Sequence, residues 1–151
     1  MSLFGSLDIS AGALSAERLR MDVTAENLAN AQSTRTANGG PYRRKEVVTE
    51  ATGGGGFASA LASARGGAGG SGSGPDGGVR VAGIVEDQTP NRLVYDPGHP
   101  DANAQGYVSM PNVNPVTEMV DLISASRSYE ANVTAMQTSK QMFTKTLDLL
   151  R

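Results

Sequence analysis

The sequence predicts a mainly α fold in which an N-terminal and a C-terminal helix pair as an antiparallel-type coiled coil, accompanied by a small β-rich middle region and a flexible Gly-rich loop. Apolar residues recur every seven positions near both ends of the chain, as in the seam of a coiled coil. The middle is different, because 12 of the 19 glycines lie within residues 53–78. Leu, Ile, Val and Phe supply only 29 of the 151 residues, a share typical of chains that are partly unfolded alone. We therefore expect the two helices to bury their apolar stripes on assembly.

The first predicted helix extends from about Ser6 to Asn30. Its composition is rich in good helix formers, and its apolar stripe has the seven-residue spacing of a coiled coil. Gly12 lies inside it together with small residues at Ala11 and Ala25, and we interpret these as sites of tight packing. The stripe consists of Leu7, Leu14, Met21 and Leu28.

The middle of the chain contains several short extended segments. Val47 and Val48 favour a strand over residues 42–50, and the glycine-rich residues 53–78 predict a flexible loop because they bury too little to offset their ordering entropy. Further extended segments are predicted around residues 79–85, 93–95 and 107–110, with a turn at Asp96-Pro97-Gly98. So few strands are too small to be stable without the helices.

The last predicted helix has a clear beginning. Asn114 is a good capping residue, Pro115 suits the first helical position, and Glu118 falls in the positively polarised first turn. No Gly or Pro follows up to Arg151, which predicts a helix of roughly 55 Å. Its seam combines two series, namely Leu122, Tyr129, Met136, Phe143 and Leu150, and Met119, Ser126, Val133, Lys140 and Leu147.

Ser126 and Lys140 are polar residues at seam positions. Such residues weaken a coiled coil while fixing its register or its partner, and the alternative is that the helix turns them toward solvent. Both interpretations stay open. The chain divides into an N-terminal helical segment at residues 1–36, a β-rich middle at 37–112 that contains the Gly-rich insertion 53–78, and a C-terminal helix at 113–151.

Composition excludes several classes of function. A formal net charge of −2 argues against binding nucleic acid, which requires a clustered excess of Lys and Arg. The absence of cysteine excludes disulfides and thiolate metal sites. No apolar run is long enough to insert in a membrane, and the first residues do not resemble a cleavable signal peptide.

The residues also offer little to an enzyme, and we predict no catalysis, no cofactor, no metal and no small-molecule substrate. The single histidine, His99, is interpreted as an exposed loop residue. The helix carboxylates, among them Glu118 and Asp121, are interpreted as solvent-facing charges, and the basic run 43–45 as a surface-strand charge run in preference to a phosphate or lipid contact. The glycine run 53–56 lacks the Lys-Ser/Thr of a phosphate-binding loop.

Several motifs resemble one known family. Asn27-Leu28-Ala29-Asn30 is similar to the signature of the bacterial flagellar rod and hook proteins. Nearly the whole chain resembles the proximal rod subunits of that family. Only residues 53–78 lie outside this resemblance. The matching segments are Pro41–Lys45, Leu93–Pro100, Gly106–Val113, Glu118–Val120 and Ser124–Asn132.

The resemblance implies a structural subunit of the flagellar proximal rod in the basal body, which transmits motor torque. It implies terminal helices that pair as a coiled coil and stack helically, and export without a cleavable signal peptide through the flagellar type III apparatus. The implied partners are copies of the chain itself, other proximal and distal rod proteins, the rod/MS-ring junction protein and the export apparatus.

The expected assembly interface combines both seams with two amides, those of Asn27 and Asn30, which we expect to satisfy helix-end backbone groups at the joint between neighbouring subunits. Two rivals remain at this point: a soluble coiled-coil adaptor or secreted component of a related type III system, and a cell-wall hydrolase. The interface residues are Leu7, Leu14, Met21, Asn27, Leu28, Asn30, Met119, Leu122, Tyr129, Val133, Met136, Phe143, Leu147 and Leu150.

Overall fold

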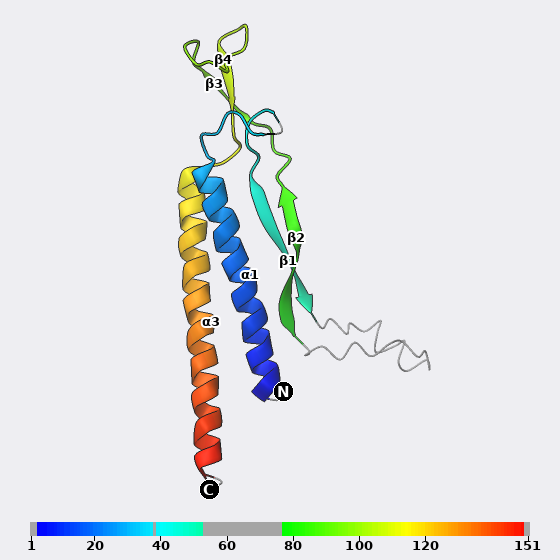
Figure 1. The fold of residues 1–151 in the computed structure, drawn as a ribbon, viewed down its shortest axis with the longest axis vertical. Coiled ribbons are helices and arrows are strands. Elements are labelled where there is room, and N and C mark those ends of the chain that lie inside the picture. The colour runs from blue at the N-terminus through cyan, green and yellow to red at the C-terminus, as the bar shows by residue number, and fades with distance from the viewer. Residues whose placement is uncertain (1–2, 38, 53–76, 150–151) are drawn as a thin grey trace, which may run out of the picture. The chain divides into compact units, whose positions relative to one another are not determined.

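The computed structural model describes residues 3–37, 39–52 and 77–149 and contains two long helices and four strands (Figure 1). The Gly-rich segment 53–76, Leu150 and Arg151 lie outside the described residues, so the predicted loop is described only at its edges. In chain order the elements are α1 (Leu3–Ala29), β1 (Lys45–Thr52), β2 (Gly78–Glu86), β3 (Arg92–Tyr95), β4 (Tyr107–Met110) and α3 (Pro115–Leu149).

The start of α3 confirms the predicted cap. The Asn114 side-chain oxygen accepts a hydrogen bond from the Val116 backbone N–H at 3.1 Å, and its carbonyl accepts the Glu118 N–H at 3.0 Å. Two N–H groups in the first turn of α3 therefore have an acceptor on Asn114. None of the helices in the described part of the chain is long and apolar enough to cross a bilayer.

The strands form two separate two-stranded sheets, β1 with β2 and β3 with β4. In the second sheet the strands are antiparallel, with Val94 opposite Val108 and Tyr95 opposite Tyr107. The extended segments were predicted correctly, but β1 begins at Lys45 and not at Tyr42. The reason is that the Tyr42 N–H bonds the Ser33 carbonyl and the Arg44 N–H bonds the Asn112 side chain.

The chain forms two compact units. The first comprises Met1–Ala16, Thr49–Ala82 and Ser128–Arg151, and the second comprises Glu17–Val48 and Gly83–Arg127. Each of α1, α3, β1 and β2 therefore contributes to both.

In the first unit, α1 packs closely against β2. A Cβ atom added at Gly12 would lie 3.1 Å from the Val79 carbonyl oxygen, closer than ordinary contact. Gly12 is thus a site of tight packing, as predicted, although its neighbour is a strand. Leu7 and Met136, from the two predicted seams, line one open hollow together with Ala11.

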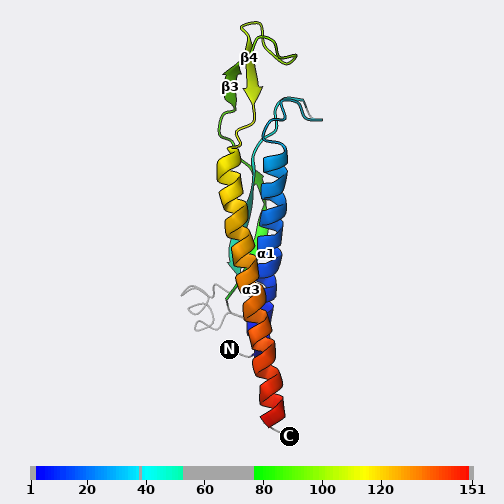
Figure 2. The same cartoon turned by 90° about the vertical axis from the view of Figure 1, so that its left-hand side faces the viewer.

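In the second unit, the end of α1 and the beginning of α3 lie side by side and run in opposite directions (Figures 1 and 2). Val108 and Ala125 are almost completely buried, and Ala31, Tyr42 and Val113 form a small apolar cluster. An N-terminal and a C-terminal helix with a small strand region are therefore confirmed, with helices of 27 and 35 residues against strands of four to nine.

Candidate functional site

The centre of the second unit is a hydrogen-bonded set of side chains, Asn27, Tyr42, Arg44 and Glu118, that contacts the backbone of Lys45. We call these residues the Asn27 network. They come from α1, from the segment leading into β1, and from the first turn of α3.

Asn27 uses all of its hydrogen-bonding capacity. Its Nδ2 atom donates to the Lys45 carbonyl at 2.8 Å and to Glu118 Oε2 at 3.1 Å. Its Oδ1 atom accepts from the Lys45 N–H and from Tyr42 Oη, both at 2.9 Å. Asn27 is only 1% exposed, and its amide bonds the backbone N–H and carbonyl of Lys45 in the way that a neighbouring strand would.

Glu118 is buried to the same extent, so its interpretation as a solvent-facing carboxylate was wrong. Its burial is compensated because Oε1 accepts a hydrogen bond from Arg44 Nε at 2.6 Å while Oε2 accepts from Asn27. A buried charge is stable only when it is paired and hydrogen-bonded in this way.

Arg44 carries the positive charge of the network. Its guanidinium also lies 3.7 Å from Asp121 and 3.6 Å from Glu46, and the hydrogen bond with Glu118 is the main cause that raises the pKa of Arg44. For Arg44, the interpretation as a surface-strand charge was therefore wrong. Its neighbours Arg43 and Lys45 are half-buried as well, and Lys45 pairs with Glu26 at 2.6 Å.

Tyr42 is held in its neutral form. Burial, together with the negative charges of Glu26, Glu118 and Glu86, raises the pKa of Tyr42 to about 12. Its hydroxyl donates to Asn27, so the neutral phenol is also the form that the network requires.

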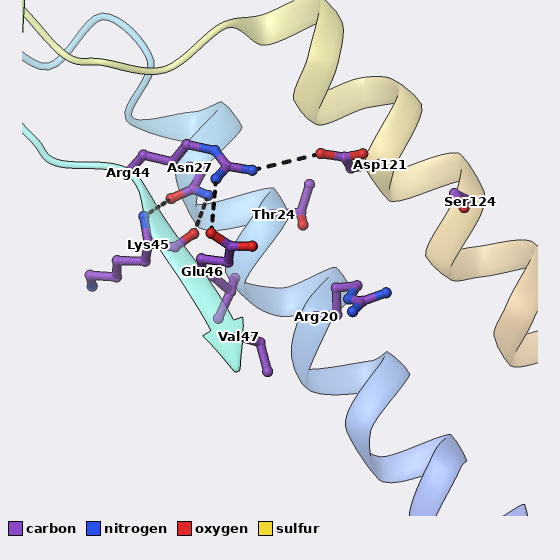
Figure 3. A pocket seen from close by; sticks show the side chains of 10 residues that line it. Arg20, Thr24, Asn27, Arg44, Lys45, Glu46, Val47, Asp121 and Ser124 are labelled. Carbon is purple, nitrogen blue, oxygen red and sulfur yellow. Dashed lines mark hydrogen bonds and ion pairs between the residues drawn. The ribbon is translucent and has the colours of Figure 1, made fainter. Parts of the chain in front are cut away.

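A hollow of about 180 Å³ opens beside the network (Figure 3). Figure 3 shows Arg44 reaching toward Asp121 on α3, and Asn27 bonded to Lys45 at the start of β1. The cations that line it are already matched by carboxylates: Arg20 by Glu17, Arg44 by Glu118, and Lys45 by Glu26. The arrangement is suited to holding three elements together.

The predicted interface residues differ in exposure. Asn27 is buried, Met119, Phe143 and Leu147 are exposed, and Leu150 lies outside the described residues. The half-buried members are Leu7, Leu14, Met21, Leu28, Asn30, Leu122, Tyr129, Val133 and Met136. Besides Asn27, the α1 positions that the chain itself buries are Ala16, Val23 and Thr24, none of which belongs to the predicted interface.

The two amides differ in their partners. Asn30 Nδ2 donates to the Glu26 carbonyl in the last turn of α1 of its own chain at 3.0 Å, and its role at a joint between subunits stays a prediction. Asn27 instead bonds the backbone of Lys45 at the start of β1. His99 lies in a turn, as expected, where its Nδ1 accepts the Asp101 N–H at 3.1 Å.

The sequence analysis did not predict that Arg44 and Asn27 both bond to Glu118. The only signal was that all three lie in segments that resemble the same family. Their positions are separated by 74 and 91 residues, so no local pattern places them together.

Two family models match the ends of the chain. Residues 7–35 match the "Flagella basal body rod protein" model, and residues 104–149 match the "Flagellar basal body rod FlgEFG protein C-terminal" model. The first match includes Asn27, and the second includes Glu118.

Curated relatives match over almost their whole length. The chain is 52% identical to the flagellar basal-body rod protein FlgC of Bacillus subtilis, across 99% of both chains. It is 46% identical to FlgC of Escherichia coli O6:H1, across 99% of this chain and 98% of that one. The chain belongs to the FlgC family of flagellar basal-body rod proteins. FlgC of Borreliella burgdorferi, 43% identical, extends the similarity across all of this chain and 99% of that one.

Proposed function

We propose that this FlgC-family chain is a structural subunit of the bacterial flagellar basal-body rod. The observation that carries the proposal is the similarity to two FlgC proteins at 52% and 46% identity, which covers 99% of this chain and 99% and 98% of the relatives. Because those relatives are rod proteins along their whole length, a soluble adaptor of another type III system is not favoured. The role is structural, and the proposal assigns it no catalysis.

More finely, we propose a place in the proximal rod, where the subunit transmits motor torque. The terminal helices pair as a coiled coil and contact further copies and other rod proteins, and the chain reaches the basal body through the type III export apparatus. The half-exposed seam residues support this, because Leu14, Met21 and Leu28 keep apolar surface that their own chain leaves uncovered.

The Asn27 network supports a role in transmitting torque. It joins α1, the start of β1 and α3 within the second unit through one buried amide and one buried ion pair. A shaft subunit needs elements that keep their positions under torque, and a fully satisfied buried polar network rigidifies such a joint.

The experiment is a complementation assay in a strain that lacks this chain. Leu28→Asp and Met136→Asp place a charge on half-buried seam positions, so we expect normal export, measured by immunoblot of the exported fraction, and loss of swimming. Gln137→Asp is the matched control on an exposed position beside Met136, and it should swim normally. Normal motility of either seam variant would refute the assembly role of the seams.

A second measurement tests the location. Isolated basal bodies should contain the wild-type chain and the Gln137→Asp variant but neither seam variant. If the wild-type chain is absent from basal bodies of a motile strain, the rod assignment itself is refuted.

A further inference from the structure

The first part of α3 carries apolar side chains on the side opposite its buried face. Glu118 and Ala125 are 1% exposed, whereas Val116, Val120 and Ile123 are 65%, 60% and 54% exposed. Val120 is two residues from Glu118, which is about 200° around a helix. We call Val116, Val120 and Ile123 the outer face of α3.

A helix that is apolar on two opposite faces needs a neighbour on each of them. The inner face meets α1 within the second unit, where Glu118 bonds Asn27. Among the residues that the structure describes, none gives the outer face a comparable cover, since more than half of each of its side chains is exposed.

One charge marks the end of the outer face. Arg127 follows Ile123 by four residues, which continues the same side of the helix, and it is exposed. It forms no ion pair among the residues that the structure describes. A partner that covers the outer face should therefore place a carboxylate beside Arg127, about one helical turn beyond the residues that contact Ile123.

The chain itself carries a matching surface on α1. Asp22, Ala25 and Ala29 are exposed and share one side of that helix. Asp22 likewise forms no ion pair within the described ranges. Alanines at this spacing form a shallow groove that admits a ridge of larger side chains.

The spacings agree in one orientation. Arg127 follows Val120 by seven residues, and Ala29 follows Asp22 by seven, about 10.5 Å of helix in both cases. When the two helices are antiparallel with Arg127 beside Asp22, Val120 falls beside Ala29, and Ile123 falls within one residue, about 1.5 Å, of the level of Ala25. A parallel arrangement would separate the two charges.

We propose that the outer face of α3 docks on the Asp22–Ala29 side of α1 in a second copy of this chain. The α1 of the same copy meets α3 through its buried side, at Asn27, so its Asp22 side stays open to a neighbour. The contact is heterologous, because each copy presents one helix and receives another, and such contacts build open stacks. The inference rests on the proposed rod function and names the contact between copies.

Charge exchange tests the contact in the full chain, in a strain that lacks the wild-type copy. Arg127→Glu and Asp22→Arg each place like charges at the contact, so each should weaken it about two- to fivefold and reduce swarm diameter. The double variant restores an ion pair and should recover the swarm. Arg18→Glu combined with Arg127→Glu is the matched control, and it should not recover.

Cross-linking tests the register. The chain has no cysteine, so cells that express a tagged Val120→Cys copy together with an untagged Ala29→Cys copy provide one defined pair of thiols. We expect a disulfide-linked species that contains both copies in isolated basal bodies. Arg18→Cys in place of Ala29→Cys lies about 16 Å further along α1 and should give no such species.

Three results would overturn the inference: a double charge variant no better than the single ones, equal cross-linking to Arg18→Cys, or cross-linking of Val120→Cys to a different rod protein. The presence of the chain in basal bodies is measured in the same samples. Its absence would refute the proposed function, whereas its presence without rescue and cross-link would refute only this contact.

Discussion

Asn27 on α1 donates a hydrogen bond to the buried carboxylate of Glu118 on α3, at 3.1 Å and across 91 positions of the sequence. The amide that forms this bond also pairs with both backbone groups of Lys45. The Asn27 side chain thus connects two helices and the start of a strand. Its substitution should therefore disturb the contacts between all three elements.

Replacing Glu118 should be costly, because it leaves the Arg44 guanidinium without its principal acceptor. We expect Glu118→Ala to lower the free energy of unfolding by about 3 kcal/mol, measured by urea titration. Asp121→Ala is the control, since that carboxylate is half exposed and 3.7 Å from Arg44, and it should cost less than about 1 kcal/mol. Equal losses in the two variants would contradict the special role of Glu118.

The two asparagines of the family signature should respond differently to the same change. Asn27→Asp removes the donor to the Lys45 carbonyl and places a second carboxylate beside Glu118, so we expect a loss of about 2–4 kcal/mol. Asn30→Asp removes only one bond to the Glu26 carbonyl, a group that already accepts the Asn30 backbone N–H, and should cost about 1 kcal/mol or less. Thermal unfolding followed by circular dichroism distinguishes them, and an Asn30 variant as unstable as the Asn27 variant would argue against the network.

Tyr42 should make the fold sensitive to strong alkali. Its pKa is raised from 10.0 to about 12, so the folded state holds the phenolic proton more tightly than the unfolded state does. The resulting stability is fully present below pH 10 and is lost as the pH rises toward 12, by about 2–3 kcal/mol.

The measurement for Tyr42 is the free energy of unfolding at pH 8 and at pH 11.5, compared with that of Tyr42→Phe. The wild type should lose more stability over this interval than the variant, because Phe cannot ionise. Parallel pH profiles for the wild type and Tyr42→Phe would refute the assignment.

Gly106 should be intolerant of a side chain for two separable reasons. Its φ of +81° is a left-handed conformation, and an added Cβ would lie 2.9 Å from the Tyr95 ring, which itself packs edge-on against Tyr107. Gly39→Ala supplies the first cost alone, about 1–2 kcal/mol, because its φ is +78° but no atom lies within 4 Å of the added Cβ. We expect Gly106→Ala to cost more than Gly39→Ala by urea titration, and equal costs would show that the tyrosine ring moves aside freely.

Local signals predicted the elements well and the network poorly. The cap at Asn114 and the absence of Gly or Pro after Pro115 were sufficient to place α3, because helix starts are determined by neighbouring residues. The burial of Glu118 was not predictable in the same way, since a first-turn carboxylate is normally solvated. It becomes stable only when Arg44 and Asn27 arrive from distant parts of the chain.

The heptad stripes show the same limit. Leu14, Met21 and Leu28 were predicted as a seam, and they are half buried, whereas the α1 residues that the chain buries are Ala16, Val23, Thr24 and Asn27. A seven-residue period indicates that a helix has an apolar stripe, but it does not say whether the partner belongs to the same chain. The sequence did not predict the apolar outer face of α3, because that face extends only from Val116 to Ile123. This stretch is too short to show a repeating apolar spacing.

The separation of Asn27 from Glu118 also sets the order of events in folding. During synthesis from the N-terminus, Asn27 and Lys45 are made long before Glu118. The Asn27 network therefore stays incomplete until most of the chain is present. Contacts of such high sequence separation form late and slowly. Before α3 is made, Asn27 has three of its four partners, on Tyr42 and Lys45, while Arg44 still lacks the carboxylate of Glu118.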